Sequence, residues 1–348
     1  MLAGQYPGQS DREALQRALR TAEVADETGL DSVWVAEHHF VPYGVVPSAA
    51  TLAALLLGRT GRIRIGTAIS VLTTAHPVAL GEQAVLLHMA SGGRFTLGVG
   101  RGGPWVDLEV FGGGVEALER GFPESLGLLL RWLNESCVGA DGDRYRFREV
   151  PVVPRPADAP PVVVACTSPA TAELAARHGL PMLLGMHAGD EEKAEMVARW
   201  RKSAEDAGHC PEADHVSVGV CQVADSHTEA VEVLRRALPG WLRQGLAAHR
   251  TVDGRPRSMR DPLAYTELLC ELHPVGPPQL CADRLAATAE RTGITRFALL
   301  AEGSGDLTAT ETNVRRIADD VLPLLSGDAA GAAARPRDIS SRAVRATD

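Results

Sequence analysis

Three side chains capable of proton transfer, Glu37–His39, follow directly on the short apolar run Val33–Val35. An apolar run of this length is typical of a strand that is buried on both faces. Parallel α/β folds build their sites at the carboxyl ends of such strands, so the two adjacent histidines are placed for chemistry. Histidine is also the usual titrating group near neutral pH. In the alternative interpretation, one histidine is buried and hydrogen-bonded and the other is solvated.

A glycine-rich loop, Gly98–Gly103, ends a second strand-like run that begins at Arg94. Its G-x-G-x-x-G spacing matches the dinucleotide fingerprint of a Rossmann fold. That fingerprint needs a helix that begins at once, so that its amino terminus meets the pyrophosphate, and Pro104 and the glycines at 112–114 are poor material for one. We therefore interpret the loop as backbone amides that face an anion together with Arg101.

A second loop suited to an anion follows the apolar run at 161–165. Cys166–Ser168 supplies hydroxyl groups and amides, and a predicted helix containing Thr171 starts directly behind it. The positive end of that helix would lie against a phosphate. The alternative is that the Thr and Ser residues cap the helix in the ordinary way. Two strand ends that can each bind phosphate predict a phosphorylated cofactor.

The elements that position these loops alternate between strand and helix. A capping box at Ser10 and Glu13 predicts a first helix that ends at Gly29. Eight strands interleaved with helices predict a (β/α)8 barrel, and a doubly wound sheet is the alternative. The expected strands are a stub at residues 1–3 and residues 33–36, 63–69, 94–100, 161–166, 182–185, 216–223 and 296–301.

The predicted barrel is a single domain over residues 1–325, with a polar excursion at 134–160 and an irregular segment at 247–276. Residues 326–348, rich in Ala and Gly and without periodicity, are expected to be disordered. The first strand is unusually short. Either the barrel closes with a stub, or the sequence begins downstream of the true initiator.

Bulk composition narrows the class of protein. The chain has 348 residues, of which 45% are hydrophobic, and its net charge of −9 argues against nucleic-acid and anionic-membrane partners. Neither a signal peptide nor a run of about 20 apolar residues is found, so a cytoplasmic protein is expected. The six cysteines are widely spread without a C-x-x-C pair, which favours reduced thiols over a disulfide framework or a metal site.

Taken together, five long segments closely resemble the bacterial luciferase-like family of flavin-dependent monooxygenases, which includes the luciferase α-chain. They cover most of residues 11–325 in the family's order. The resemblance implies a (β/α)8 barrel that binds FMN at the carboxyl ends of its strands. The segments read DSVWVAEHHF, IGTAISVLTTAHPVA, SGGRFTLGVGRGGPWVDLEVFG, PVVVACTSPATAELAARHGLPMLL and HPVGPPQLCADRLAATAERTGI.

The resemblance also implies roles for individual residues. His38 matches the catalytic histidine, His39 stands beside it, and Glu37 could orient it. In the family a cis peptide against the flavin ring joins the pair that matches Ala68 and Ile69. The sequence departs from luciferase at Gly100, Thr167 and Met186, so the organic substrate is left open. The resemblance further implies Arg101, Thr167, Ser168 and Thr171 for the flavin phosphate with the Gly103 amide, Arg120 near it, and Met186 on the substrate side. From their positions after strands, Cys166 belongs to the same anion loop and His187 is expected to line the substrate cavity.

As an activity, the resemblance implies an FMNH2-dependent monooxygenase that acts on a small organic substrate with O2 through a flavin C4a-hydroperoxide. It further implies a separate reductase that supplies the reduced flavin, a homodimer formed through the second and third helices, and a lid at 247–276. Two alternatives stay open: an oxidoreductase of the same fold that uses the deazaflavin F420, and a non-catalytic flavin-binding subunit.

Overall fold

The computed structural model describes residues 1–253 and 260–329. Helices and strands alternate along most of this length. In chain order they are α1 (Asp11–Glu27), β1 (Ser32–Val35), α2 (Ala49–Arg59), β2 (Arg64–Thr67), β3 (Ser70–Val71), α3 (Pro77–Ala90), β4 (Phe95–Gly100), α4 (Asp107–Val110), α5 (Gly114–Glu116), the π-helix η1 (Ala117–Gly121), α6 (Phe122–Asn134), β5 (Cys137–Asp141), β6 (Arg146–Pro151), β7 (Val162–Cys166), α7 (Pro169–Arg177), β8 (Met182–Leu184), α8 (Asp190–Asp206), β9 (Val216–Val220), β10 (Gln222–Val223), α9 (His227–Ala248), α10 (Pro262–Leu272), β11 (Val275–Gly276), α11 (Pro278–Thr292), β12 (Arg296–Leu300), α12 (Leu307–Arg316), the π-helix η2 (Ile317–Val321) and α13 (Leu322–Ala329).

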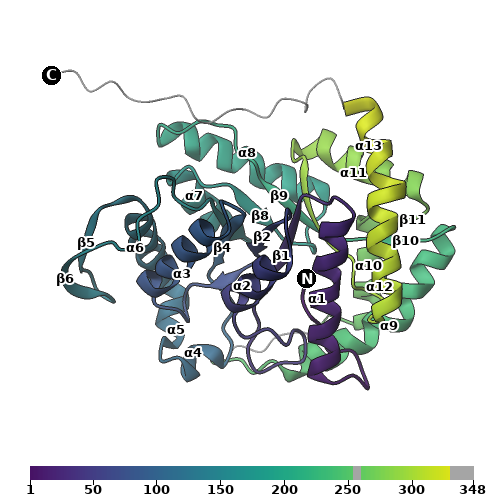
Figure 1. Ribbon diagram of the computed structural model, residues 1–348, viewed down its shortest axis with the longest axis horizontal. Coiled ribbons are helices and arrows are strands. Elements are labelled where there is room, and N and C mark those ends of the chain that lie inside the picture. The colour runs from purple at the N-terminus through teal and green to yellow at the C-terminus, as the bar shows by residue number, and fades with distance from the viewer. Residues whose placement is uncertain (254–259, 330–348) are drawn as a thin grey trace.

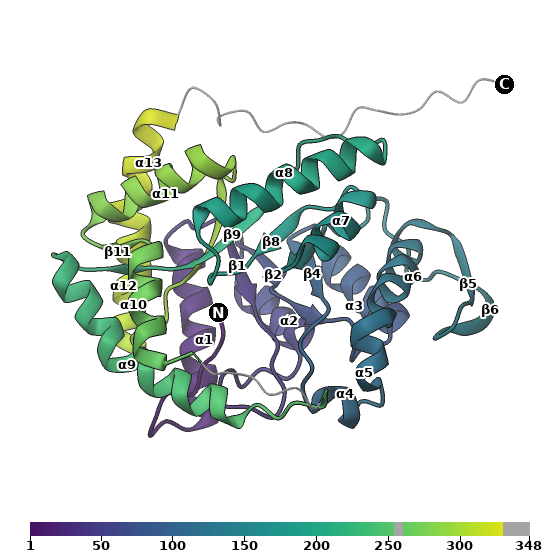
Figure 2. The ribbon, with the colours of Figure 1, turned by 180° about the vertical axis from the view of Figure 1, so that it is seen from behind.

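A parallel sheet in the order β1-β2-β4-β7-β8-β9-β12 forms a nearly closed barrel, with β3 paired to β4. The longer helices surround it, and α1 and α12 lie side by side on one flank (Figure 1). The same arrangement is seen from behind in Figure 2. The predicted (β/α)8 barrel is confirmed, because each connection crosses over the sheet on a helix as parallel pairing requires.

Successive side chains of each strand point to opposite faces of the sheet, so they contribute to two separate cores. Side chains that point inward fill the barrel centre, where Trp34, Val163, Leu183 and Val216 are buried together. The alternate residues point outward against the helices, as Val33 and Val35 do in the largest core cluster. The strands are therefore apolar on both faces, which is why short apolar runs mark them in the sequence.

Three segments differ from the expected strands. The stub expected at residues 1–3 forms no strand element. The expected strand at 216–223 is interrupted at Cys221, and its second part, β10, pairs with β11 outside the barrel. The polar excursion at 134–160 contains an antiparallel hairpin, β5–β6, which projects from one end of the molecule (Figure 1). Only one face of this hairpin meets the body of the protein, so its strands lack the apolar runs that mark the barrel.

The segment at 247–276, expected to be irregular, contains the helix α10. The side chain of Asp261 accepts a hydrogen bond from the backbone N–H of Ala264, and Pro262 occupies the first turn, so the local start signal was present in the sequence. Residues 254–259 of this segment lie outside the described residues. So does most of the tail expected to be disordered, because α13 continues to Ala329.

Among the residues that the structure describes, no helix combines the length and apolar character that a membrane crossing needs. The prediction of no membrane-spanning segment rested on the same observation in the sequence.

Gly98 is predicted to be intolerant of a side chain. A Cβ atom there would overlap the backbone carbonyl oxygen of Thr67. The hydroxyl group of Thr67 also donates to the Gly98 carbonyl oxygen at 2.7 Å and accepts from the Gly98 N–H at 2.9 Å, which joins β2 to β4. We expect Gly98→Ala to lower the free energy of unfolding by about 3 kcal/mol in urea titrations, since backbone atoms must shift. Gly127→Ala is the control: its Cβ meets no neighbour, and alanine should raise helix stability by about 0.5–1 kcal/mol. Equal stabilities for the two variants would contradict the prediction.

Candidate active site

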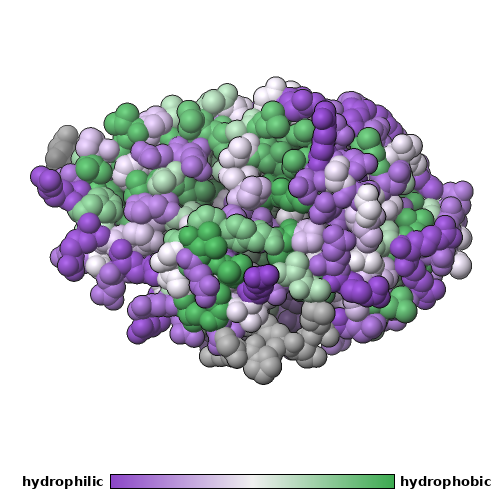
Figure 3. Space-filling model, turned by 90° about the horizontal axis from the view of Figure 1, so that it is seen from below, coloured by the Kyte–Doolittle hydropathy of each residue, from purple (hydrophilic) through white to green (hydrophobic). Residues whose placement is uncertain are grey.

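Four neighbouring strands carry the predicted site residues to one rim of the barrel. β1, β2, β4 and β7 are consecutive in the sheet, and Val99 pairs with Val164 in the last two. The histidine pair, Ala68–Ile69, the glycine loop and Cys166–Ser168 follow these strands in that order. Figure 3 views the molecule from the side on which α4 and α5 lie, where the surface is hollowed near its centre between apolar and polar patches.

His38 is half-buried and lies edge-on to the ring of Tyr43, at 5.1 Å between centroids. Its Nδ1 atom is buried and has no hydrogen-bond partner in the described part of the chain. Burial, followed by the positive charge that His249 and His39 would carry, lowers the pKa of His38 to about 3. Titration near neutral pH, which the sequence suggested, is therefore not expected. The neutral ring offers one donor and one acceptor nitrogen.

Glu37 faces His39 rather than His38. The carboxylate lies 3.5 Å from Nε2 of His39, and it accepts hydrogen bonds from the backbone N–H groups of Ala49 and Val71 at 2.9 and 3.0 Å. Alternate residues of an extended chain point to the same side, which places Glu37 with His39 and leaves His38 on the other side. Glu37 thus joins the start of α2 and β3 to the histidine segment.

Two further titratable residues, His249 and Asp107, complete this region, and sequence reasoning missed both. Nδ1 of His249 lies 2.9 Å from the carbonyl oxygen of Gly245, and its ring centroid is 4.5 Å from that of Trp105. Asp107 is buried at the start of α4, and burial raises the pKa of its carboxyl group. His249 ends α9 more than 200 residues after His38, so no spacing in the sequence connects them.

The segment around Arg250 is held against the glycine loop. The carbonyl oxygen of Arg250 accepts a hydrogen bond from the N–H of Val106 at 2.9 Å, and the N–H of Val252 donates to the carbonyl oxygen of Pro104 at 3.0 Å. Trp105 and Thr251 form an antiparallel bridge between the two segments. This contact brings the start of the predicted lid onto the rim that carries the histidines.

Ala68–Ile69 and Gly100 form one wall of the rim. The peptide bond between Ala68 and Ile69 is cis, as the family resemblance predicts. A Cβ atom on Gly100 would come within 2.6 Å of the Ile69 side chain and 3.2 Å of Ala165, so glycine is required for the close approach of these strands. This wall therefore offers backbone and small apolar side chains, the kind of surface on which a flat ring system can lie.

Arg101 follows β4, and the amino terminus of α7 follows the neighbouring strand β7. The guanidinium group of Arg101 is exposed and, among the described residues, forms no ion pair, while Thr73 bonds its backbone carbonyl group at 2.7 Å. The hydroxyl group of Ser168 caps α7 at the N–H of Thr171 and lies 2.8 Å from the Thr171 hydroxyl. Thr167, between β7 and α7, is exposed. A cation and a helix amino terminus at the ends of neighbouring strands are groups that can bind an anion such as a phosphate.

Three other predicted residues fit this site less directly. The thiol of Cys166 is turned inward to the carbonyl oxygen of Val164 at 3.4 Å, and burial raises its pKa to about 12, so only its backbone is available. Arg120, in η1, pairs with Glu116 of α5 at 2.7 Å on the exposed side of this helical segment. Gly103 lies against the indole of Trp105, which leaves its N–H group as the available donor.

Met186 and His187 line a cavity of about 1360 Å³ together with Tyr43, Ala68 and Tyr265. The backbone carbonyl of Met186 is 2.6 Å from Nε2 of the buried His273, which fixes the loop after β8. The predicted substrate residues therefore face the barrel interior on the side of Ala68.

A pH dependence of stability is expected from His38. The unfolded chain takes up a proton near pH 6.5 and the folded chain only near pH 3, so the unfolded state binds more protons between these values and stability falls as the pH decreases through this window. His38→Gln should remove about 1–2 kcal/mol of the loss between pH 7 and pH 5, measured by urea unfolding. The exposed His209, changed to Gln, serves as the control. Identical losses in wild type and His38→Gln would contradict the prediction.

The model of the luciferase-like monooxygenase family matches residues 1–296. The chain belongs to this family. Its members include the alkanal monooxygenase alpha chain of Photorhabdus luminescens, which is 30% identical over 346 aligned residues that cover 93% of this chain and 96% of the relative. The monooxygenase RslO1 of Streptomyces bottropensis has a similar solved structure, with a TM-score of 0.79, 25% identity and coverage of 90% and 94% of the two chains.

Two other solved structures of the luciferase-like fold bear on the cofactor. The oxygenating constituent of 3,6-diketocamphane monooxygenase from Pseudomonas putida, solved with FMN, has a TM-score of 0.73 at 22% identity, and covers 92% of this chain and 95% of its own. An F420-dependent secondary alcohol dehydrogenase has the same TM-score at 19% identity, with coverage of 92% and 96%. At these identities the likeness shows the fold alone, which serves enzymes of both cofactor types.

Proposed function

We propose that this luciferase-like enzyme is an FMNH2-dependent monooxygenase. The observation that carries the proposal is that the exposed Arg101 follows β4 and the Ser168-capped α7 follows the neighbouring strand β7, on the same rim as His38. Bound FMNH2 supplies two electrons for the activation of O2, so that one oxygen atom enters a small organic substrate and the other leaves as water.

The chain's own residues would bind and orient the flavin. Arg101, Thr167, Ser168 and Thr171 hold the phosphate, with the N–H group of Gly103, and Ala68–Ile69 and Gly100 support the ring. Charge-assisted hydrogen bonds from a guanidinium are the strongest neutralising contacts available to a phosphate. Arg120 would contribute less positive charge to the phosphate, because its guanidinium group is already paired to Glu116.

His38 would act on the reacting oxygen atoms as a neutral imidazole that donates or accepts a proton. His39, held by Glu37, positions the segment, and Met186 and His187 line the substrate side. The contact between 250–252 and 104–106 supports a lid that limits the access of water, which protects reactive flavin species from unproductive breakdown.

We further propose a homodimer and a separate flavin reductase as partners. Exposed apolar side chains on α2 and α3 support the dimer: Leu55, Leu86 and Met89 are 49%, 59% and 48% exposed. An unpartnered apolar face of this kind is typical of an interface. The reductase follows from the glycine loop, where no long helix begins directly after Gly103, so the fingerprint of a nicotinamide site is incomplete.

Anaerobic titration with FMNH2, oxidised FMN and reduced F420, followed by admission of O2, tests this function. We expect FMNH2 to bind at least about tenfold more tightly than the other two, a difference of about 1.4 kcal/mol. One O2 should then be consumed per FMNH2. Tighter binding of reduced F420 without consumption of O2 would instead assign the chain to hydride transfer. Binding of flavin without any reaction with O2 would favour the non-catalytic subunit.

A further inference from the structure

Four side chains around the cavity can bind a polar group, and the proposed flavin site uses none of them to hold the flavin. Tyr43, His187 and Tyr265 line the cavity of about 1360 Å³. Arg260 is exposed beside it, with its guanidinium carbon 5.2 Å from the centre of the Tyr265 ring. These four residues are called the polar cluster below.

Three parts of the chain bring the polar cluster together. Tyr43 follows β1, His187 follows β8, and Arg260 and Tyr265 lie at or just before the start of α10. Tyr43 and Tyr265 pack against one buried apolar group, formed mainly by α9 and α10. Arg260 is close to both His187 and Tyr265, because its charge adds to the effect of burial in lowering the pKa of His187 and opposes the increase that burial causes in the pKa of Tyr265. The four side chains therefore lie together at one end of the cavity.

The polar groups of the cluster are free to bind a ligand. The hydroxyl groups of Tyr43 and Tyr265 and the imidazole of His187 form no hydrogen bond to another residue that the structure describes, and Arg260 forms no ion pair with one. Burial raises the pKa of both tyrosines and lowers that of His187, so at neutral pH the phenols are protonated and the imidazole is uncharged. The charge of Glu192 acts on His187 less than that of Arg260 does. The cluster thus offers two hydroxyl donors, an imidazole N–H and a guanidinium.

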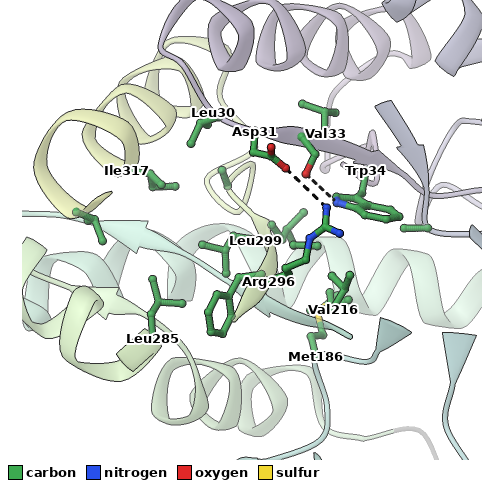
Figure 4. A pocket seen from close by; sticks show the side chains of 18 of the residues that line it. Leu30, Asp31, Val33, Trp34, Met186, Val216, Leu285, Arg296, Leu299 and Ile317 are labelled. Atoms are coloured by element: carbon green, nitrogen blue, oxygen red, sulfur yellow. Dashed lines mark hydrogen bonds and ion pairs between the residues drawn. The ribbon is translucent and has the colours of Figure 1, made fainter. Parts of the chain in front are cut away.

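Another part of the cavity wall has its polar groups already satisfied. Asp31 and Arg296 are the charged side chains labelled in Figure 4, and they pair with each other at 3.8 Å. The indole N–H of Trp34 donates to the hydroxyl group of Ser32 at 3.2 Å. The other labelled side chains, among them Met186, are apolar. Compared with this wall, the polar cluster offers a ligand groups that still lack hydrogen-bond partners.

These donors favour a ligand group that is rich in acceptors and negatively charged. A hydrocarbon, or an aldehyde with its one neutral oxygen, would displace water and leave most of the donors without a partner, which costs free energy for each group. A carboxylate accepts about four hydrogen bonds and pairs with a guanidinium. An inorganic anion would satisfy the donors but would leave the apolar walls of a cavity of about 1360 Å³ uncovered.

We propose that the organic substrate is an apolar carboxylate, whose carboxylate group binds to the polar cluster and whose apolar body lies against the cavity wall. This inference rests on the proposed function, because the cavity forms the substrate side of that site. Tyr43 connects the two regions, since its ring belongs to the cluster and also meets His38 edge-on at 5.1 Å. Binding of the carboxylate would therefore fix the orientation of the apolar body relative to His38.

Fluorescence titration of the full chain without flavin tests the proposal with three probes: 2-naphthoate, 2-naphthamide and 2-methylnaphthalene. They share one apolar ring system and carry a charged acceptor, a neutral amide and no polar group, respectively. We expect wild type to bind 2-naphthoate at least about tenfold more tightly than 2-naphthamide. Because no flavin is present, the result is independent of FMNH2 binding and O2 consumption, so this proposal and the proposed function can fail separately.

Variants of the polar cluster separate ligand binding from packing. Arg260→Gln should weaken the binding of 2-naphthoate at least about tenfold and change that of the two neutral probes by less than about twofold. Arg260→Lys keeps the charge and should lose less than about threefold. Tyr265→Phe should weaken the binding of 2-naphthoate about three- to tenfold and leave that of 2-methylnaphthalene unchanged, because it removes only a hydroxyl group.

Arg148→Gln and Tyr145→Phe are the matched controls, because both residues belong to the hairpin β5–β6, which lies at the opposite end of the molecule from α10 (Figure 1). Both variants should bind 2-naphthoate as wild type does. Equal affinities of wild type for 2-naphthoate and 2-naphthamide would overturn the proposal. So would an equal loss of affinity for all three probes in Arg260→Gln or Tyr265→Phe, or displacement of 2-naphthoate by millimolar inorganic phosphate but not by chloride of the same ionic strength.

Discussion

Replacement of His38 by alanine is expected to lower the yield of oxygenated product by about 10²–10⁴-fold, the usual range for loss of a general acid or base. FMN binding should change by less than about threefold, because the residues proposed to hold the phosphate follow β4 and β7 rather than β1. Peroxide release per FMNH2 consumed should rise to nearly one. Product yield, peroxide yield and flavin affinity are measured in the same preparation.

The physical reason is the environment of the ring. Burial and the neighbouring histidines keep His38 neutral, so one of its nitrogens can accept a proton at any pH at which the enzyme works. An apolar contact with Tyr43 excludes water from one edge. The activity of wild type should therefore show no step near pH 6.5 that His38→Ala removes, which distinguishes a neutral imidazole from one that titrates.

His209→Ala is the matched control, because this exposed histidine lies on the surface and its Nε2 is 3.0 Å from the carbonyl oxygen of Arg177. It should leave product yield unchanged. If His38→Ala retained wild-type coupling of O2 to product, His38 would have no part in the proton transfer, although the flavin site could remain as proposed.

The parts of the fold that the sequence predicts are those with local signals. Barrel strands are apolar on both faces, so Val33–Val35 and Val162–Cys166 are visible as runs, and Ser10 with Glu13 fixes the start of α1. The break after Val220 has no such signal, since Gln222 and Val223 continue the pattern of the strand while pairing outside the barrel. Pairing partners of edge strands depend on distant segments, which a local pattern does not contain.

In the candidate site, too, some residues have a local signal in the sequence and others do not. Its strand-end residues follow from the rule that parallel sheets gather their sites at one rim, and Arg101 and Thr167 do follow the neighbouring strands β4 and β7. The sequence did not show that Glu37 faces His39 rather than its neighbour His38, because this depends on how side chains alternate after β1 and not on adjacency in the chain. His249 lies at the rim because the end of α9 packs there, against Tyr43 and Trp105, and only the tertiary structure shows this contact.

Replacement of Arg101 by alanine is expected to weaken the binding of FMN and of FMNH2 by about 10–100-fold. One charge-assisted hydrogen bond to a phosphate contributes about 1.5–3 kcal/mol, and in the described residues no other guanidinium lies in the loops directly after β4 and β7, at 101–106 and 167–168. Riboflavin, which lacks the phosphate, should bind wild type and variant within about twofold of each other. Fluorescence titration of both flavins measures the difference.

Arg131→Ala provides the control, because Arg131 is likewise partly exposed but pairs with Glu135 on the outer face of α6, away from the rim. It should bind FMN as wild type does. Arg120→Ala should fall between the two, since its charge is already shared with Glu116. Salt should weaken FMN binding to wild type more than to Arg101→Ala, because screening acts on the charge that the variant lacks. An equal loss of FMN and riboflavin affinity in Arg101→Ala would mean that Arg101 supports the rim rather than the phosphate.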